Sequence, residues 1–275
     1  MTPALLASIL LGAPVAVGAL VMWLAGAPPA RWAGHVAAGA VGISVYVAVT
    51  RAPRSSRSMS LAAIVAGVIA IACSLCSPGL QGVHRWLVIW GVRLHASQFV
   101  MPALLVCAAT RFRDSPARPQ GLLLAIQGIH FLQPDAGQAT SVAAASLALT
   151  VGGRSTWGSR ACAAASVVTA IATWLRPDPL PAVPFVEDIV RRAFAVNRWL
   201  GCFGLAFLAA ATIAPIVSVR QARDPATVRA GRALSAYFVA AVLATSFGQF
   251  PVPLFGFGAS SVLGAFLGLA VLRYR

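Results

Sequence analysis

Two carboxylates and two arginines lie close together in the short polar stretch EDIVRR, which holds Glu187, Asp188, Arg191 and Arg192. A carboxylate can act as a general base and take a proton from a hydroxyl group. Guanidinium groups bind phosphate oxygens through paired hydrogen bonds. On a helix, Asp188 and Arg192 would share a face, because they are four residues apart. The stretch therefore predicts proton abstraction beside an anionic group, and the alternative is a surface helix with a simple ion pair.

A further carboxylate, Asp135, lies in the segment LQPDAG between two apolar stretches. Pro134 cannot donate a backbone hydrogen bond and disturbs a helix interior, whereas Gly137 permits irregular backbone. We therefore expect a break between two membrane-spanning helices at this point. Asp135 would pair with Arg85 or cap the start of the next helix, and with Gln133 it would shape a substrate site unless it is itself catalytic.

Three histidines, His84, His95 and His130, fall at the ends of apolar stretches. Imidazole and carboxylate groups are ligands of divalent cations, so these residues and Asp135 could bind one. The alternative is that each histidine has an ordinary hydrogen-bond partner at the rim of the membrane. The sequence indicates no other cofactor.

The elements that position these residues are expected to be membrane-spanning helices. Of the 275 residues, 59% are hydrophobic and only 10% are charged, and the mean hydropathy is +0.83. A soluble domain has about a quarter of its residues charged. The net charge of +15 would suggest nucleic acid as the partner of a soluble protein. Here the 21 basic residues are all arginines spread over loops, so we expect a lipid bilayer and no nucleic acid.

Ten apolar segments of roughly 14 to 22 residues predict an all-α fold with about ten transmembrane helices. The chain reads as a single polytopic domain over residues 1–275, with outer loops at about 78–94 and 176–198. We place the ten spans at 4–25, 32–50, 59–77, 95–110, 119–132, 138–152, 161–175, 199–219, 233–250 and 255–272.

The arginines indicate how these spans are oriented, because positive residues stay on the cytoplasmic side. With ten spans and a cytoplasmic N-terminus, 14 arginines fall inside and seven outside. Both termini are therefore expected in the cytoplasm. A composition rich in alanine, glycine and arginine without lysine suggests a bacterial genome, and hence the bacterial inner membrane. Four of the six acids fall on the outer side, so we expect any chemistry to be extracytoplasmic: Asp135, Asp178, Glu187 and Asp188.

Three segments together resemble one family. The segment GVHRWLVIWGVRLHASQ at 82–98 is similar to the G-x-x-R-W and Q-P-S-E motifs of the SEDS proteins, which include RodA and FtsW. LQPDAG resembles L-Q-P-D-x-G, and PVPLFGFGASS at 251–261 resembles the segment before the last span of that family. The matching residues are Gly82, Arg85, Trp86, Ser97, Leu132, Gln133, Pro134, Asp135, Gly137, Pro251, Pro253, Phe255, Gly258, Ser260 and Ser261.

The resemblance implies a peptidoglycan glycosyltransferase. Such proteins polymerise lipid II, an undecaprenyl-pyrophosphate-linked sugar, on the outer face of the membrane, usually with a single-span class B penicillin-binding protein. The base would be Asp188, which is our counterpart of the catalytic aspartate of the family, or its neighbour Glu187. The expected substrate-binding residues are Arg85, Arg93, Arg191, Arg192, Arg198, Asp135, Gln133, Trp86 and Ser260.

The chain also departs from the family. Gln98 and Met101 replace an acid and a lysine that form an ion pair in the family, and the outer loop at 176–198 lacks its glycine-rich part. These departures favour an alternative, a catalytically inactive membrane scaffold that binds a partner or lipid. A lipid flippase is the third hypothesis, weakened by the lack of charged residues inside the spans.

Overall fold

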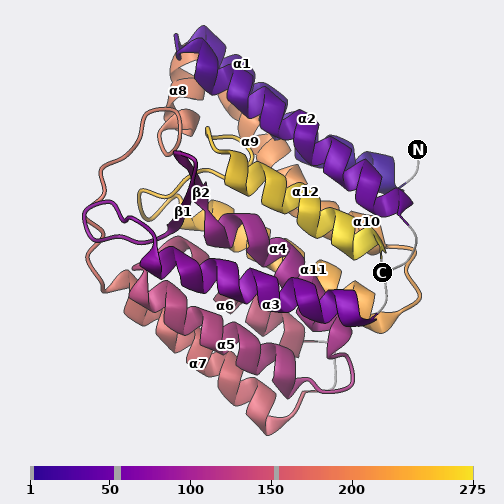
Figure 1. Cartoon of the computed structure of the whole chain (residues 1–275). Helices are drawn as coiled ribbons and strands as arrows, with labels where there is room; N and C mark the ends of the chain where they lie inside the picture. The colour runs from indigo at the N-terminus through magenta and orange to yellow at the C-terminus, as the bar shows by residue number, and fades with distance from the viewer. Residues whose placement is uncertain (1–2, 53–56, 152–154, 275) are drawn as a thin grey trace.

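The protein is a bundle of α-helices with one small β-hairpin. The computed structural model describes residues 3–52, 57–151 and 155–274. Figure 1 shows the helices running along one common direction. Within the described residues the helices are α1 (Pro3–Leu24), α2 (Pro29–Arg51), α3 (Arg57–Cys73), η1 (Ser74–Cys76), α4 (Ala96–Arg111), α5 (Ala117–Leu132), α6 (Ala136–Thr150), α7 (Trp157–Trp174), α8 (Ile189–Val196), α9 (Arg198–Thr212), α10 (Ala214–Val219), α11 (Pro225–Ala244) and α12 (Ala259–Tyr274).

Each of the ten predicted spans corresponds to helix, which confirms the all-α class of a multi-span membrane protein. Three described helices are long and apolar enough to cross a bilayer by themselves: Leu5–Leu24, Pro29–Arg51 and Pro225–Ala244. Shorter apolar helices accompany them, at Ser60–Cys76, Ala96–Arg111, Arg198–Thr212 and Ala259–Tyr274.

One predicted span is divided into two helices, and the bounds of another are wrong. The span predicted at 199–219 is divided into α9 and α10 at Ile213. The span predicted at 233–250 is α11, which begins at Pro225 because Asp224 caps it through Ala226 N–H and Thr227 N–H. The helix ends at Ala244, with Thr245 as its C-cap.

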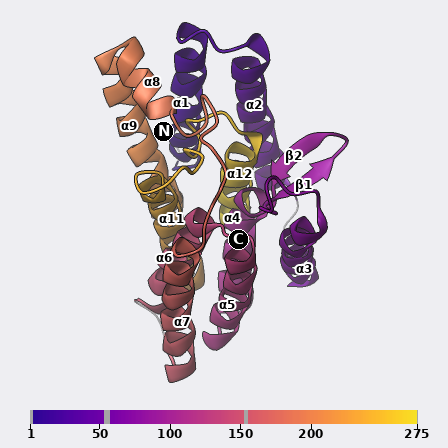
Figure 2. The ribbon, with the colours of Figure 1, turned by 90° about the vertical axis from the view of Figure 1, so that its left-hand side faces the viewer.

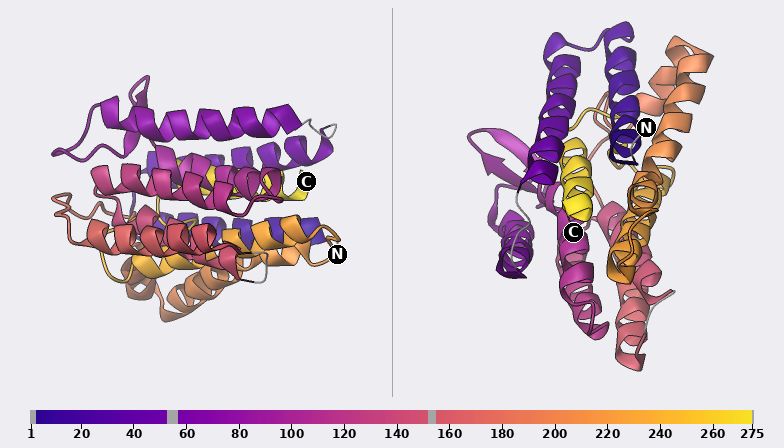
Figure 3. Two further views of the ribbon diagram at one scale, coloured as in Figure 1. Left: turned by 90° about the horizontal axis from the view of Figure 1, so that it is seen from below. Right: turned by 90° about the vertical axis from the view of Figure 1, so that its right-hand side faces the viewer.

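The two ends of the chain lie at the same end of the bundle. In Figure 1, α1 starts and α12 ends at the end opposite to the hairpin and α8. Figure 3 shows the same arrangement from below. This placement agrees with an even number of spans and with two termini on one side of the membrane. We refer to the end that carries the hairpin and α8 as the outer end.

The outer loop predicted at 78–94 contains a β-hairpin that the sequence reading did not predict. Strands β1 (Trp86–Ile89) and β2 (Val92–His95) pair antiparallel, with Trp86 opposite His95. Trp90 and Gly91 form the connection at φ values of 49° and 80°, as a tight hairpin turn requires. The hairpin projects from the outline of the bundle beside α2 and α3 (Figures 2 and 3).

Two non-helical segments, 175–188 and 245–258, cross the outer end next to each other (Figure 2). They are joined by backbone hydrogen bonds from Val252 N–H to the Val186 carbonyl at 3.3 Å and from Phe257 N–H to the Phe185 carbonyl at 2.7 Å. The second segment contains residues 251–258 of the PVPLFGFGASS motif, and the last three residues of the motif begin α12. The two segments therefore bring the predicted acidic loop onto the last predicted motif.

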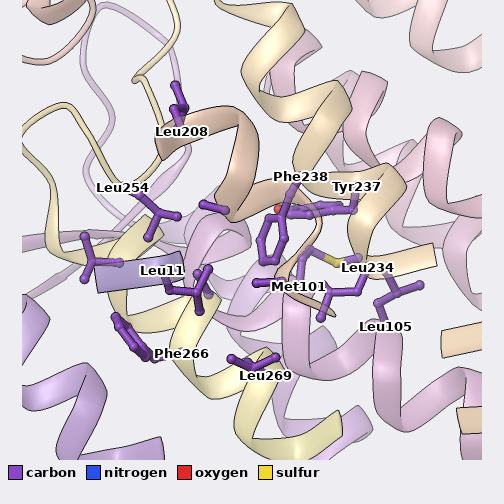
Figure 4. Close-up of a cluster of buried hydrophobic side chains, with 14 of the residues drawn as sticks. Leu11, Met101, Leu105, Leu208, Leu234, Tyr237, Phe238, Leu254, Phe266 and Leu269 are labelled. Atoms are coloured by element: carbon purple, nitrogen blue, oxygen red, sulfur yellow. The ribbon is translucent and has the colours of Figure 1, made fainter. Parts of the chain in front are cut away.

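The apolar core joins helices from both halves of the chain (Figure 4). Its buried side chains come from α1, α4, α9, α11, α12 and the 245–258 segment: Leu11, Met101, Leu105, Leu208, Leu234, Tyr237, Phe238, Leu254, Phe266 and Leu269. Helix α12 lies against α4 at very short range. A Cβ atom at Gly264 would lie only 2.0 Å from the Gln98 carbonyl oxygen, so close packing in the membrane depends on glycine here.

Candidate functional site

A cavity of about 320 Å³ lies at the outer end of the bundle, below the two crossing segments. The hairpin, the α5–α6 break, α11 and both segments contribute to its walls. Its polar and ionisable lining residues are Gln81, Arg85, Trp86, His95, Gln98, Asp135, Gln138, Glu187, Tyr237, Gln249 and Ser261. Motif residues that lie more than a hundred positions apart in the sequence therefore face one space.

Arg85 is the guanidinium group of this cavity, and it is only 5% exposed. Its Nε donates to the Gln133 carbonyl at 3.3 Å. Its Nη2 donates to the Pro134 carbonyl and forms an ion pair with Asp178 at 2.7 Å. The predicted pairing of Arg85 with Asp135 is therefore wrong, because the two carbonyls of the α5–α6 break and Asp178 take its donors. Its Nη1 takes part in none of these bonds.

Asp135 has the predicted capping role. Its Oδ1 accepts from Gln138 N–H at 3.1 Å at the start of α6. Its Oδ2 lies 3.2 Å from His95 Nε2, within ion-pair distance but without hydrogen-bond geometry. Burial raises the pKa of the Asp135 carboxyl, but His95 and Arg85 outweigh burial and hold this pKa well below its usual range. Asp135 is therefore an ionised carboxylate on the wall of the cavity.

Glu187 also lines the cavity, from the outer loop. Its Oε2 accepts from Val183 N–H at 2.6 Å. Burial raises the pKa of the Glu187 carboxyl above its usual value, and the bond from Val183 only partly opposes this effect. The cavity thus combines two carboxylates whose surroundings shift their pKa values in opposite directions, a combination that is typical of acid–base sites.

Asp188 is not among the residues that line the cavity. Its Oδ1 accepts from Phe185 N–H at 2.6 Å, and its Oδ2 accepts from Arg192 Nε at 2.7 Å. The predicted contact between Asp188 and Arg192 is present, at the N-terminus of α8. Arg191 lies 3.6 Å from the same oxygen and is largely exposed. Both oxygens of Asp188 are thus occupied, one by the turn at Phe185 and the other by Arg192 of α8.

The other predicted arginines are dispersed over the outer surface. Arg93 is exposed on β2, and Arg198 lies over the Trp199 ring at 5.1 Å. With Arg191 and Arg192 at the Asp188 turn, Arg85 is the one member of the predicted arginine set that lines the cavity. The expected clamp of several arginines is therefore not assembled within the described residues.

Of the predicted residues Trp86, Gln133 and Ser260, Trp86 alone lines the cavity. Trp86 lines the cavity and meets the His95 ring edge-on at 5.9 Å. Gln133 is buried and donates to Ser74 Oγ at 2.6 Å. Ser260 accepts from His95 N–H at 2.9 Å, so it joins the start of α12 to the hairpin.

The three histidines do not converge on Asp135. His95 lies beside it, whereas His84 Nδ1 lies 2.9 Å from the Ser77 carbonyl and His130 Nε2 lies 2.9 Å from Ser97 Oγ. Among the described residues, no group of three or more His, Cys, Asp or Glu side chains is arranged to hold a metal ion. The divalent cation stays a prediction, and the described residues offer it no preformed set of ligands.

Sequence reasoning gave no role to Arg31 or to Phe185. Phe185 is buried at a φ of 68°, between the guanidinium groups of Arg192 at 4.3 Å and Arg31 at 5.6 Å from its ring. Arg31 also donates to the Pro184 carbonyl at 2.9 Å. The proline-rich stretch before Phe185 signals a turn, but no sequence signal connects that turn with Arg31, which lies 153 residues away.

Comparisons with known proteins find chains of similar fold. No family model matches the sequence, and no curated protein matches it. In fold, the chain is similar to the crystal structure of the rod shape determining protein RodA of Thermus thermophilus. The TM-score is 0.76 at 18% identity, over 98% of this chain and 94% of that one. A mutant of the same RodA gives a TM-score of 0.76 at 18% identity, over 98% and 95% of the two chains.

A chain from a structure described as a peptidoglycan synthase complex that coordinates polymerization and crosslinking is also similar. It gives a TM-score of 0.69 at 19% identity, over 98% of this chain and 96% of that one. Nearly the whole length of each structure is matched. This protein therefore has the RodA-like fold of the SEDS proteins.

Proposed function

We propose that the protein is a SEDS-type glycosyltransferase of cell-wall synthesis. It would polymerise an undecaprenyl-pyrophosphate-linked sugar, similar to lipid II, on the outer face of the bacterial inner membrane. The observation that carries this proposal is the outer cavity, in which Glu187, Asp135 and Arg85 face one space at the end of a RodA-like bundle.

Glu187 is the proposed base. Glycosyl transfer requires removal of a proton from the acceptor hydroxyl, and a carboxylate with a raised pKa is suited to this step. Glu187 lines the cavity and has one oxygen bonded to Val183 N–H. Both oxygens of Asp188 are already bonded, one to Phe185 N–H in the turn before α8 and the other to Arg192 within α8. We therefore propose Glu187 as the catalytic residue and Asp188 as a positioning residue.

Arg85 is the proposed contact for the leaving pyrophosphate. Its guanidinium group is held rigidly by two carbonyls and Asp178, and its Nη1 is left for a ligand. A fixed cation in a poorly hydrated site stabilises developing negative charge without reorganisation. We propose the exposed arginines Arg93, Arg191 and Arg198 only as an attraction for anionic substrate at longer range.

The proposed partner is a single-span class B penicillin-binding protein. The peptidoglycan synthase complex with a similar chain supports this pairing. A catalytically inactive scaffold is the second candidate, and the replacement of an acid and a lysine of the family by Gln98 and Met101 favours it. Gln98 lines the cavity, so this replacement directly changes the site.

Polymerisation of labelled lipid II by the purified protein, alone and with the partner, distinguishes the two candidates. A glycosyltransferase gives glycan polymer with at least one of the two preparations. A scaffold gives none, although it still binds the partner. Folding is monitored by thermal unfolding, so that loss of structure is not read as lack of activity.

A further inference from the structure

The most deeply buried acceptor on the cavity wall is a carboxylate with one oxygen left over. Asp135 is 2% exposed. Its Oδ1 is used in capping α6, whereas its Oδ2 is buried and has only the ion-pair contact with His95 Nε2 at 3.2 Å, without an aligned hydrogen bond. A buried acceptor whose hydrogen bonds are incomplete is costly, and such atoms are rare in folded proteins. A carboxylate oxygen in this position beside a cavity is therefore expected to accept from a ligand.

His95 presents a donor at the same place. Its Nδ1 accepts from Gln98 N–H at 3.4 Å, which leaves Nε2 as the donor of the ring. Nε2 lies 3.2 Å from Asp135 Oδ2, but the two atoms do not have hydrogen-bond geometry. A donor and an acceptor thus lie side by side, and each keeps capacity for a third group.

The pair is held rigidly from several sides. His95 N–H donates to Ser260 Oγ at 2.9 Å at the start of α12, and the His95 ring caps α4 through Gln98. Asp135 is fixed by the start of α6. Ligand-binding groups that are supported in this way lose little freedom when a ligand binds.

An aromatic side chain completes the constellation. Trp86 lines the cavity and meets the His95 ring edge-on at 5.9 Å, and Gln98 adds an amide to the same wall. A sugar ring has hydroxyl groups on its rim and an apolar face of C–H groups that suits an aromatic side chain. The cavity, at about 320 Å³, is at the lower end of small-molecule sites, which begin at about 300 Å³. It suits one ring better than a whole oligosaccharide.

We propose that Asp135, His95 and Trp86 form a subsite that binds one hydroxyl-bearing sugar ring. A ring hydroxyl donates to Asp135 Oδ2, another ring oxygen accepts from His95 Nε2, and the apolar face of the ring lies on Trp86. The inference rests on the proposed function, because it takes the ring to be part of the lipid-linked substrate.

Binding of N-acetylglucosamine to the purified full-length protein tests this subsite. The measurement is saturation-transfer NMR in detergent, supported by the change in tryptophan fluorescence. We compare wild type with Asp135→Asn, which keeps a helix-capping side chain but removes the charge. The matched control is Asp224→Asn, because Asp224 also caps a helix but lies at the opposite end of the bundle.

The expected result is binding by wild type and by Asp224→Asn, and binding weakened at least about tenfold in Asp135→Asn, as for the loss of one charge-assisted hydrogen bond. His95→Asn, which is short enough to keep a capping oxygen near the position of Nδ1 but has no donor at the position of Nε2, is expected to weaken binding as well. It serves as the second variant if Asp135→Asn is unstable. Failure of wild type to bind the sugar, or unchanged binding in both variants, would overturn the subsite.

Lipid II polymerisation by the same preparations separates this inference from the proposed function. Sugar binding that depends on Asp135 in a protein that makes no polymer supports the subsite and rejects the glycosyltransferase. If the wild type makes polymer and sugar binding is unaffected in Asp135→Asn and His95→Asn, the subsite alone is rejected.

Discussion

Replacing Arg85 tests whether its buried contacts hold the outer site together. The side chain is 5% exposed, and it donates to the carbonyls of Gln133 and Pro134 and to Asp178, whose side chain is 24% exposed. Removing one partner of a buried ion pair costs about 3–5 kcal/mol. The partial exposure of Asp178 favours the lower half of that range for Arg85→Met. Arg85→Lys keeps the charge, but a lysine cannot bond all three acceptors. It should therefore lower the free energy of unfolding by about 1.5–3 kcal/mol, the value of a hydrogen bond to a charged group.

Thermal unfolding in detergent measures these effects. One kcal/mol corresponds to roughly 2–4 °C for a chain of this size, so Arg85→Met should lower the midpoint by on the order of 10 °C. Arg93→Met is the matched control, because Arg93 is exposed on the hairpin that directly follows Arg85. It should change the stability by less than about 0.5 kcal/mol. A small effect of Arg85→Met, or an equal effect of Arg93→Met, would refute the structural role of Arg85.

Three further predictions concern pH, capping and packing. Because burial raises the pKa of Glu187 and a base must be unprotonated, polymerisation should fall as the pH drops through a value above the usual glutamate pKa of about 4.3. A pH–rate profile whose acid limb lies at or below that value would contradict the assignment. Burial raises the pKa of the Asp224 carboxyl, but the hydrogen bonds from Thr227 and Ala226 outweigh burial and lower this pKa. The ionised Asp224 therefore stabilises the folded protein at neutral pH, and this contribution is lost as the pH falls through the folded-state pKa. Asp224→Ala should lower the free energy of unfolding by about 1 kcal/mol at pH 7 and by less at pH 3. An equal loss at pH 7 and pH 3, measured by thermal unfolding, would contradict this prediction. Gly264→Val should lower the free energy of unfolding by about 1–3 kcal/mol or prevent folding, because the valine Cβ would lie 2.0 Å from the Gln98 carbonyl oxygen. An unchanged expression level and an unchanged unfolding temperature would disprove the close contact.

Much of the fold follows from hydropathy and from a few local signals. Ten apolar segments correspond to helices, because a bilayer requires long apolar elements whose backbone groups are paired internally. The break at Pro134 and the cap at Asp135 follow from residue type alone. The early start of α11 was also visible in the sequence, in the aspartate–proline pair at 224–225. Hydropathy alone placed the start of this helix too late, because Arg229 and Arg232 lower the mean hydropathy of its first turns.

The hairpin and the contacts of Arg85 were harder to predict. The turn at Trp90–Gly91 lacks the asparagine–glycine or aspartate–glycine signal of a two-residue hairpin. The sequence offered Asp135 as the partner of Arg85 because both lie on the outer side. Arg85 instead pairs with Asp178. This pairing depends on how the 175–188 segment crosses the bundle, and tertiary packing determines the path of that segment.

The choice between Glu187 and Asp188 could not be made from sequence. The two residues are neighbours, and a register shift of one position exchanges which of them faces the cavity. The register is set by Phe185, whose left-handed backbone is held by Asp188 and whose ring lies between Arg31 and Arg192. Arg31 is 153 residues from the Pro184 carbonyl that it binds.

The rate of lipid II polymerisation by Glu187→Gln and Asp188→Asn, measured beside wild type with the partner present, tests the central claim most directly. The account predicts a loss of at least about 100-fold for Glu187→Gln, the lower end of the contribution of a general base. Asp188→Asn keeps an oxygen for Phe185 N–H and should lose less than about tenfold, the value of roughly 1.4 kcal/mol. The reverse order, or full activity of Glu187→Gln, would contradict the assignment of Glu187 as the base.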